Sequence, residues 1–213
     1  DGNVYIADSN NARVRRVATN GAISTYAGNG NPGNGGDGGQ ATAAQLGNPD
    51  SLAFDSAGVL YIVDRGGHKV RKVAVNGVIS TVAGTGTAGF SGDGGQGASA
   101  QLDTPRGVAV DSAFNVYIGD TLNNRVRRVT AAGVISTFAG TGVFGGSGNG
   151  GQATAAQLGN PEDVAVDSQG KVYIADTQNA RIQMVATNGV ITTVAGDGTL
   201  GFRGDGGPAT AAW

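Results

Sequence analysis

The chain has 213 residues, of which 40 are glycine, and it contains no cysteine. Without cysteine there are no disulfides, no thiolate zinc sites and no cysteine nucleophile. The formal net charge of −2 argues against a general binder of polyanions, so we expect no nucleic-acid partner. The sequence has no apolar run of about 18 residues, so we expect no membrane span.

One segment recurs four times along the chain. Its tyrosines are Tyr5, Tyr61, Tyr117 and Tyr173, a period of 56 residues without insertion or deletion. Short β-type runs at a fixed period of this length predict a repeat architecture. We treat the chain as one partial domain, 1–213, made of units 1–56, 57–112, 113–168 and 169–213.

The predicted strands are clearest around the third unit. They cover residues 108–111, 115–120, 125–129 and 134–139, with short turns between them. Four such strands form an antiparallel meander, and the first two are apolar on both faces, so neighbouring sheets must cover them. A radial β-propeller provides this cover. The small residues of the first strand predict that it lies nearest the axis; they are Ala53, Ala109 and Ala165.

A glycine-rich segment joins each fourth strand to the next first strand. At roughly twenty residues it is long for a connection without structure of its own. Its Ala-rich end, residues 41–46 in the first copy, predicts one or two helical turns. Prolines at 49, 105 and 161 end these turns and set up the next strand. Because the segment recurs, we expect it to pack against the blades.

The strand count predicts an open structure. The chain starts at a second strand and stops at Trp213, in the column of Gln45, Gln101 and Gln157. It therefore holds three complete four-stranded units and one that lacks its first strand. We expect an arc of a larger propeller rather than a closed four-bladed ring. The start at Asp1, without methionine or signal peptide, leads us to expect a chain processed or cut from something longer.

The recurring segment resembles the NHL repeat, named after an Asn-His-Leu core. The first copy reads Asn3-Val4-Tyr5-Ile6-Ala7-Asp8 and continues to Val14. Residues 115–126 and 171–182 are similar, whereas the second unit keeps His68 but loses the asparagine beside it. The Gly-Phe-Ser-Gly-Asp-Gly-Gly loop is similar to the long repeat of exported bacterial proteins.

The resemblance implies an all-β propeller of NHL type with about six blades, of which this chain supplies four repeats. It also implies an extracellular or periplasmic location. Functions in the family range over protein binding, RNA binding and a few lyases, so the family alone does not define an activity.

Three sets of repeated aspartates are candidates for cation binding. Asp8, Asp64, Asp120 and Asp176 end the second strands, where we expect them to accept hydrogen bonds from the next turn and to pair with the cation five residues on. Asp55, Asp111 and Asp167 end the first strands and are expected to serve their turns likewise. Asp37, Asp93 and Asp205 lie in Gly-Asp-Gly-Gly, with Asn149 in the remaining copy. Calcium binding by these loops stays open, but one carboxylate per loop favours a cap for the Ala-rich turn.

Other candidate chemistry is weak. His68 is the only histidine and has no partner carboxylate in its segment, so we expect a structural or exposed side chain and no metal or cofactor. Gly84-x-Gly86-x-x-Gly89 has no βαβ context for a dinucleotide. The third strands carry a basic stripe, which we expect to pack over apolar neighbours and pair with acids; it comprises Arg15, Arg16, Arg71, Lys72, Arg127 and Arg128.

The repetition itself bears on function, because an active site needs different residues around one substrate. We therefore predict a non-catalytic scaffold that binds a protein or a glycan through its loop face. Phe90, Phe202 and Trp213 are the ligand contacts that we predict, with packing onto the blades as the alternative. Two other functions stay open. One is a lyase or lactone hydrolase whose active site lies outside this chain, and the other is a self-assembling arc joined through the open blade.

Overall fold

The computed structural model describes residues 2–213 and contains four antiparallel sheets. The first sheet holds β1 (Val4–Asp8), β2 (Arg13–Val17) and β3 (Ile23–Ala27). The second holds β4 (Pro49–Phe54), β5 (Leu60–Asp64), β6 (Lys69–Val73) and β7 (Ile79–Ala83). The third holds β8 (Pro105–Val110), β9 (Val116–Asp120), β10 (Arg125–Val129) and β11 (Ile135–Ala139). The fourth holds β12 (Pro161–Val166), β13 (Val172–Asp176), β14 (Arg181–Val185) and β15 (Ile191–Ala195).

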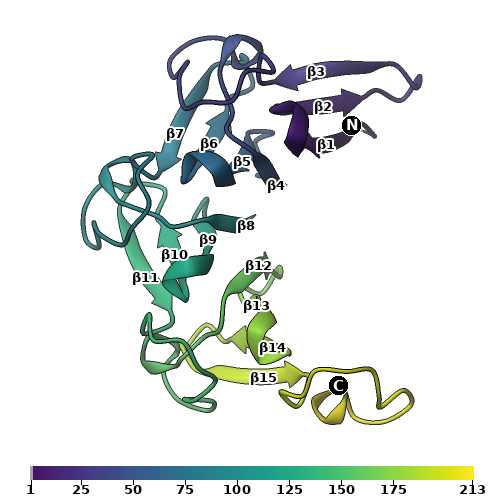
Figure 1. Cartoon of the computed structure of the whole chain (residues 1–213), viewed down its shortest axis with the longest axis vertical. Coiled ribbons are helices and arrows are strands. Elements are labelled where there is room, and N and C mark those ends of the chain that lie inside the picture. The colour runs from purple at the N-terminus through teal and green to yellow at the C-terminus, as the bar shows by residue number, and fades with distance from the viewer. Residues whose placement is uncertain (1) are drawn as a thin grey trace.

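The sheets form the open arc of a β-propeller. Figure 1 shows a C-shaped arrangement with β4, β8 and β12 on its concave side, next to the opening. The predicted all-β propeller arc is therefore confirmed. The first sheet has three strands and the others have four, as the strand count required.

The inner strands are longer than predicted. Each begins at its proline, and a bulge separates that proline from the regular part of the strand. In β8 the register shifts between Pro105 and Val108, which places Arg106 and Gly107 in the bulge. In β4 the bulge likewise contains two residues, Asp50 and Ser51, and in β12 it contains one, Glu162.

The hydrophobic core lies between blades. Three clusters of buried side chains occupy the three interfaces, and each joins two neighbouring sheets with the loop that connects them. The second, for example, combines Val70 of β6, Leu102 of the loop and Ile118 of β9, all without solvent exposure. Neighbouring sheets thus supply the cover that the two-sided apolar strands need.

The glycine-rich loops pack, as predicted. Each Ala-rich segment forms one 3₁₀ turn, such as η2 (Ala41–Ala43), η4 (Gly97–Ser99) and η6 (Ala153–Ala155). In the first loop Ala41 bonds to both neighbouring blades: its carbonyl accepts from the Gly28 N–H at 2.8 Å, and its own N–H donates to the Gly77 carbonyl at 2.9 Å. The loop backbone therefore bridges two sheets.

Candidate functional site

The aspartates that end the second strands are structural. Asp64, Asp120 and Asp176 are fully buried. Asp64 accepts hydrogen bonds from the backbone N–H groups of Gly47 (2.7 Å) and Asn48 (2.9 Å), which belong to the preceding loop. Asp120 and Asp176 likewise accept from loop amides, and also from the turn asparagine three residues on. The predicted bonds from the turn are confirmed, and the loop amides were not foreseen.

Their predicted cationic partners bond elsewhere. In three of the four units the residue five positions after the aspartate is an arginine, and it reaches a loop carbonyl sixteen residues further on. Arg13 donates to Asn29 (3.0 Å), Arg125 to Thr141 (2.6 Å) and Arg181 to Asp197 (2.9 Å). The pairing predicted from spacing is thus wrong, because the cross-strand arginine points along the sheet surface toward the loop.

Burial changes the acidity of this set. Desolvation raises the pKa of Asp64 and of Asp176, and it raises the pKa of Asp120 to about 6 despite the bonds that stabilise its charged form. Raised carboxyl pKa values in a cleft indicate catalysis, but these groups lie inside blade interfaces with no solvent access. We assign them to the packing of the loops.

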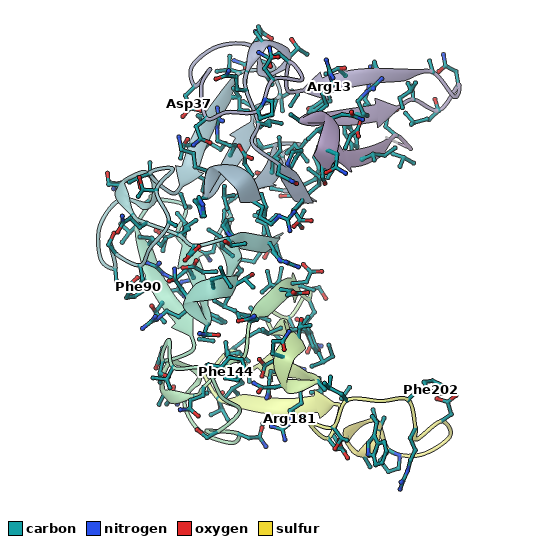
Figure 2. All side chains as sticks on the ribbon, viewed as in Figure 1. Arg13, Asp37, Phe90, Phe144, Arg181 and Phe202 are labelled. Carbon is teal, nitrogen blue, oxygen red and sulfur yellow. The ribbon has the colours of Figure 1, made fainter. Side chains whose placement is uncertain are left out.

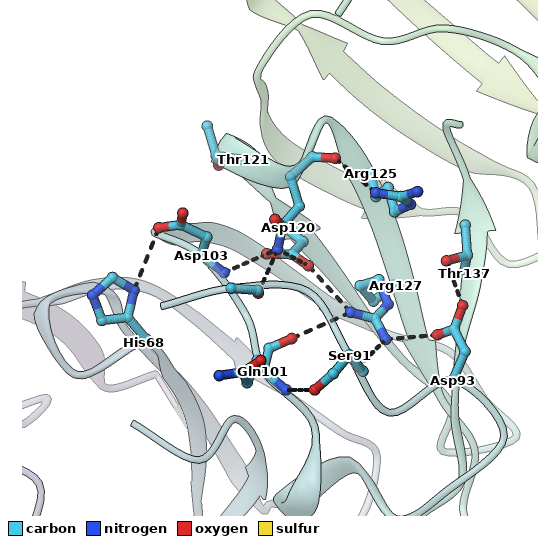
Figure 3. A network of polar contacts seen from close by, with 12 residues as sticks. His68, Ser91, Asp93, Gln101, Asp103, Asp120, Thr121, Arg125, Arg127 and Thr137 are labelled. Carbon is cyan, nitrogen blue, oxygen red and sulfur yellow. Dashed lines mark hydrogen bonds and ion pairs between the residues drawn. The ribbon is translucent and has the colours of Figure 1, made fainter. Parts of the chain in front are cut away.

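The Gly-Asp-Gly-Gly aspartates clamp neighbouring blades together. Asp93 accepts from Arg127 at 2.6 Å and from the Thr137 hydroxyl at 2.7 Å, both on the next blade (Figure 3). Asp37 bonds to the equivalent Arg71 (2.5 Å) and to Thr81 (2.6 Å). The predicted cap is wrong, since none of the Ala-rich turns has a side-chain cap bond.

Both arginines of these clamps are fully buried. Arg127 lies between two carboxylates, Asp93 on the loop and Asp120 at 3.3 Å on its own blade (Figure 3). Burial opposes the charge of Asp93, but the Thr137 hydrogen bond and the Arg127 charge together lower the pKa of Asp93. The predicted pairing of the basic stripe with acids holds for these arginines.

The third interface carries a neutral version of the clamp. Asn149 replaces the aspartate and Gln183 replaces the arginine. Asn149 accepts from the Thr193 backbone N–H at 2.7 Å, and the Thr193 hydroxyl lies 3.2 Å from the Gln183 carbonyl oxygen. At each of these three interfaces, the loop residue and its partner on the next blade are therefore either both charged or both neutral.

The aspartates that end the first strands serve their turns, as predicted. Asp111 accepts from the backbone N–H groups of Ala113 (2.9 Å) and Asn115 (2.8 Å). Its second oxygen accepts from the Tyr117 hydroxyl at 3.1 Å. Asp55 and Asp167 make the same contacts in their units.

His68 has a structural role at the second interface. Its Nδ1 accepts a hydrogen bond from the Thr104 backbone N–H at 3.1 Å and lies 3.6 Å from a carboxylate oxygen of Asp103 (Figure 3). Asn124 does the same work one unit later, accepting from Asn160 N–H at 3.1 Å. The structural role expected for His68 is thus confirmed, and the carboxylate that its own segment lacks is supplied by Asp103, from a loop distant in sequence.

The three predicted aromatic contacts do not form one patch. Figure 2 places Phe90 on the outer side of the arc and Phe202 in the C-terminal loop beyond β15. Phe90 is 40% exposed and packs under two guanidinium groups, with Arg125 3.8 Å and Arg127 4.7 Å from its ring centre. Trp213 lies under Arg203, at 4.6 Å, in the same loop as Phe202.

A different set of side chains gathers on the concave side of the arc. A cleft of about 490 Å³ is lined by Tyr5 and Ala7 of β1 and by residues from all three inner strands. The inner strands contribute Leu52 and five of the six residues that follow the bulge prolines; these five are Asp50, Ser51, Arg106, Glu162 and Asp163.

In this cleft the repeat is chemically asymmetric. The same column holds Asp50, Arg106 and Glu162, so the charge changes sign from blade to blade. Arg106 donates to Glu162 at 2.9 Å across the blade interface. At the next column, Gly107 allows close approach, because a Cβ there would lie 2.5 Å from the Asp163 Cα.

Sequence reasoning missed the cleft because it compared what the units share. The signal was available in the columns that differ: Pro-Asp-Ser, Pro-Arg-Gly and Pro-Glu-Asp follow otherwise matching loops. Columns whose side chains change sign of charge while the surrounding sequence repeats are where a role specific to one unit is to be sought.

Residues 2–213 contain no cluster of side chains that could bind a metal ion. Nowhere in this range do three or more His, Cys, Asp or Glu side chains come together in a way that could hold an ion. No helix in the same range has the length and apolar character that a membrane crossing requires.

Comparison with known proteins agrees with the fold. Residues 29–90 and 145–204, more than half of the chain, match the family model described as the teneurin NHL domain. Human teneurin-4 is 31% identical over 224 residues, which cover 92% of this chain and 8% of teneurin-4. Human teneurin-1 is 33% identical over 177 residues, covering 76% of this chain and 6% of teneurin-1. The chain thus spans less than a tenth of the length of these curated relatives.

Solved structures share the architecture at low identity. An auxiliary nutrient binding protein from Bacteroides thetaiotaomicron has a TM-score of 0.66 and 22% identity, over 91% of this chain and 46% of that chain. A streptogramin B lyase has a TM-score of 0.62 and 14% identity, over 91% and 51%. A chain from a nidogen–laminin complex has a TM-score of 0.59 and 15% identity, over 91% and 60%. At these identities the likeness shows the fold alone.

Proposed function

This chain belongs to the NHL-repeat family through its match to the teneurin NHL domain, and we propose that it is a non-catalytic binding module for a protein or a glycan. The observation that supports this proposal is the concave cleft, where charged residues from three blades lie close together and differ from blade to blade. Elsewhere the repeated acids are committed to loop amides, turns and interblade arginines. Side chains that must discriminate a ligand are thereby separated from those that hold the fold.

The cleft suits binding better than chemistry. Its residues are paired and partly exposed: the side chains of Arg106 and Glu162 are 36% and 33% exposed, and those of Arg65 and Asp50, 3.4 Å apart, are 33% and 36% exposed. Such pairs are weak in water and can exchange partners with an incoming polar ligand. A catalytic acid or nucleophile would need a desolvated or otherwise tuned environment, which this open surface does not provide.

The test is saturable binding on glycan and extracellular-protein arrays. Arg106→Ala and Asp163→Asn should abolish the strongest signal while leaving the circular dichroism spectrum and the urea midpoint unchanged. Asp167→Asn, which alters a turn far from the cleft, is the matched control and should keep the signal. Binding that survives both cleft changes would refute the assignment.

The three aromatic residues stay proposed ligand contacts on a second, loop-side surface. Phe202 is 85% exposed and Trp213 is 43% exposed, and they share the C-terminal loop. Phe90 offers only the part of its ring that Arg125 and Arg127 leave uncovered. Substitution of each by alanine in the array experiment separates this surface from the concave cleft.

Association through the open blade is a second candidate, favoured by complementary residues at the two ends of the arc. Arg15 occupies the clamp column of Arg71 and Arg127, and Asp205 occupies the column of Asp37 and Asp93. Within residues 2–213 neither Arg15 nor Asp205 takes part in an ion pair. A blade that carries the missing partner could complete either clamp. Light scattering at increasing concentration tests this: a rising mass that Asp205→Asn prevents would support it, and a constant mass would refute it.

We also propose a cellular location and a source for the protein. The long form of the repeat favours an exported protein in the extracellular space or the periplasm, and a bacterial source. Cell fractionation of the native source tests the location by measuring how much of the protein is found in the medium, the periplasm and the cytoplasm. A lyase or lactone hydrolase with its active site outside this chain stays the enzymatic alternative; turnover by the native protein that survives deletion of these four units would leave them as scaffold only.

A further inference from the structure

The basic stripe of the third strands is divided by the alternation of side chains in a strand. Arg71 and Arg127 face the loops and form the buried clamps. The next residue of each strand points to the opposite face of its sheet. These residues are Arg16, Lys72 and Arg128, and each lies directly across from a tyrosine in the strand register; the tyrosines are Tyr5, Tyr61 and Tyr117.

Each cation of this second set lines a groove beside its blade. The first groove, about 760 Å³, contains Arg16 with Tyr5, Tyr26 and Phe54. The second, about 490 Å³, contains Lys72 with Tyr61 and Phe114. The third, about 470 Å³, contains Arg128 with Tyr117 and Phe138. We call these three the cation grooves. The fourth blade breaks the pattern, because Met184 stands across from Tyr173.

The cations of the grooves lack anionic partners. In the part of the chain that the structure describes, none of Arg16, Lys72 and Arg128 lies within ion-pair distance of a carboxylate. The Nε atoms of Arg16 and Arg128 are buried without a hydrogen-bond partner there. A buried, unpaired guanidinium nitrogen is costly unless something else satisfies it.

The hydroxyls of the neighbouring tyrosines are already bonded to carboxylates. The Tyr61 and Tyr117 hydroxyls donate to Asp55 and Asp111, and burial next to these carboxylates raises the pKa of each tyrosine to about 12. These two tyrosines therefore stay neutral and engaged. Asp55 also lines the first two grooves, where it accepts hydrogen bonds from the turn amides of Ala57 and Val59 and from the Tyr61 hydroxyl and forms no ion pair with Arg16 or Lys72 in the described residues. The third groove is lined by Arg128 and by no carboxylate.

We propose that the cation grooves together bind one chain of an acidic polysaccharide. A carboxylate or sulfate on a sugar would meet the cation, while the apolar face of the ring would lie against the aromatic wall. Single-stranded RNA fits less well, because stacking of successive bases needs an open ring in each groove. Phe54 and Phe114 are 42% and 40% exposed, but the third groove offers only Tyr117, which is 5% exposed, and the partly buried Phe138. Equivalent grooves on consecutive blades favour a polymer, because the second and third contacts become intramolecular.

This site is separate from the concave cleft, apart from Tyr5, which borders both. It does not depend on the function proposed for the cleft. It also agrees with the net charge of −2, since three locally unpaired cations need no basic protein around them.

The experiment measures affinity for alginate, heparin and polyuridylic acid by biolayer interferometry at low and moderate salt. Replacing Arg16, Lys72 and Arg128 together by glutamine should weaken alginate or heparin binding at least about tenfold and flatten its salt dependence. Met184→Lys installs the missing cation in the fourth blade and should tighten binding. The matched control replaces two cations outside the grooves, Lys171→Gln with Arg203→Gln, and should change little.

The outcomes separate the possibilities. Loss in the triple variant with gain in Met184→Lys supports the inference. No polysaccharide binding by the unmodified chain, equal losses in the triple variant and the control, or tighter binding of polyuridylic acid than of either polysaccharide would each overturn it. Arg106→Ala, in the concave cleft, should leave polysaccharide binding intact, so failure of one site is distinguishable from failure of the other.

Discussion

The interblade clamp can be tested by moving the neutral version of one interface into another. Arg127 is fully buried and Asp93 is its loop partner, whereas Gln183 and Asn149 stand at the same two places one interface later. Arg127→Gln removes a buried cation from between two carboxylates and should cost about 3–5 kcal/mol, as expected when one partner of a buried pair is removed.

The complementary change is expected to cost less. Asp93→Asn leaves Arg127 with Asp120, and the Asp93 side chain is 38% exposed, so we expect a loss of about 1–2 kcal/mol. The double variant recreates an asparagine–glutamine interface that the chain already uses. It should be about as stable as Arg127→Gln alone, which corresponds to a coupling of about 1–2 kcal/mol between the two sites.

The assay is urea unfolding followed by circular dichroism, with the slope of the transition checked for each variant. Asp205→Asn is the matched control, because this aspartate occupies the same column and forms no ion pair within residues 2–213. Additive losses in the double variant, or an equal loss in the control, would refute the clamp.

Three further predictions concern single side chains. The carboxyl of Asp120 should titrate near pH 6 when followed by carbon-detected NMR. Because its pKa is raised in the folded state, its contribution to the free energy of unfolding is greatest at low pH and falls by about 3 kcal/mol as the pH rises from about 4 to 6. A titration midpoint near 4 would contradict the effect of burial. Phe90→Ala should lower the free energy of unfolding by about 1–3 kcal/mol through loss of cation–π and apolar contacts, whereas Phe202→Ala should change it little; equal effects would count against the packing of Phe90. Gly84→Ala should lower the thermal unfolding midpoint more than Gly94→Ala. Both glycines have positive φ, but a Cβ at Gly84 would meet backbone atoms, whereas a Cβ at Gly94 would meet nothing within 4 Å. Similar midpoints for the two variants would refute this.

Much of the fold could be predicted from period and pattern. The spacing of Tyr5, Tyr61 and Tyr117 defines units of equal length, and apolar residues on both faces of the first two strands require sheets on either side. The prolines at 49, 105 and 161 mark where the Ala-rich turns end, and the structure extends each inner strand back to its proline. Local chemistry was sufficient for these features because the turns and strands are made by residues close in sequence.

The partners of the polar residues could not be predicted in the same way. Asp93 and Arg127 are 34 residues apart and lie on different blades, so no local spacing rule joins them. The cation five residues after Asp120 was the obvious candidate from the sequence, yet in the structure Arg125 donates to a loop carbonyl. The simultaneous change to Asn149 and Gln183 is visible in the sequence, but its meaning depends on knowing that the two positions touch.

The sequence by itself therefore determined the repeat, the meander, the open arc and the place of the turns, all of which follow from periodic hydrophobicity and from glycine and proline. Only the tertiary structure decided which charges are buried, which are paired and which remain free. Arg127 and Arg128 are neighbours in the chain, yet one is sealed inside a clamp and the other lines a groove. The reason is that a strand turns successive side chains to opposite faces, and what each face meets is set by how one blade packs against the next.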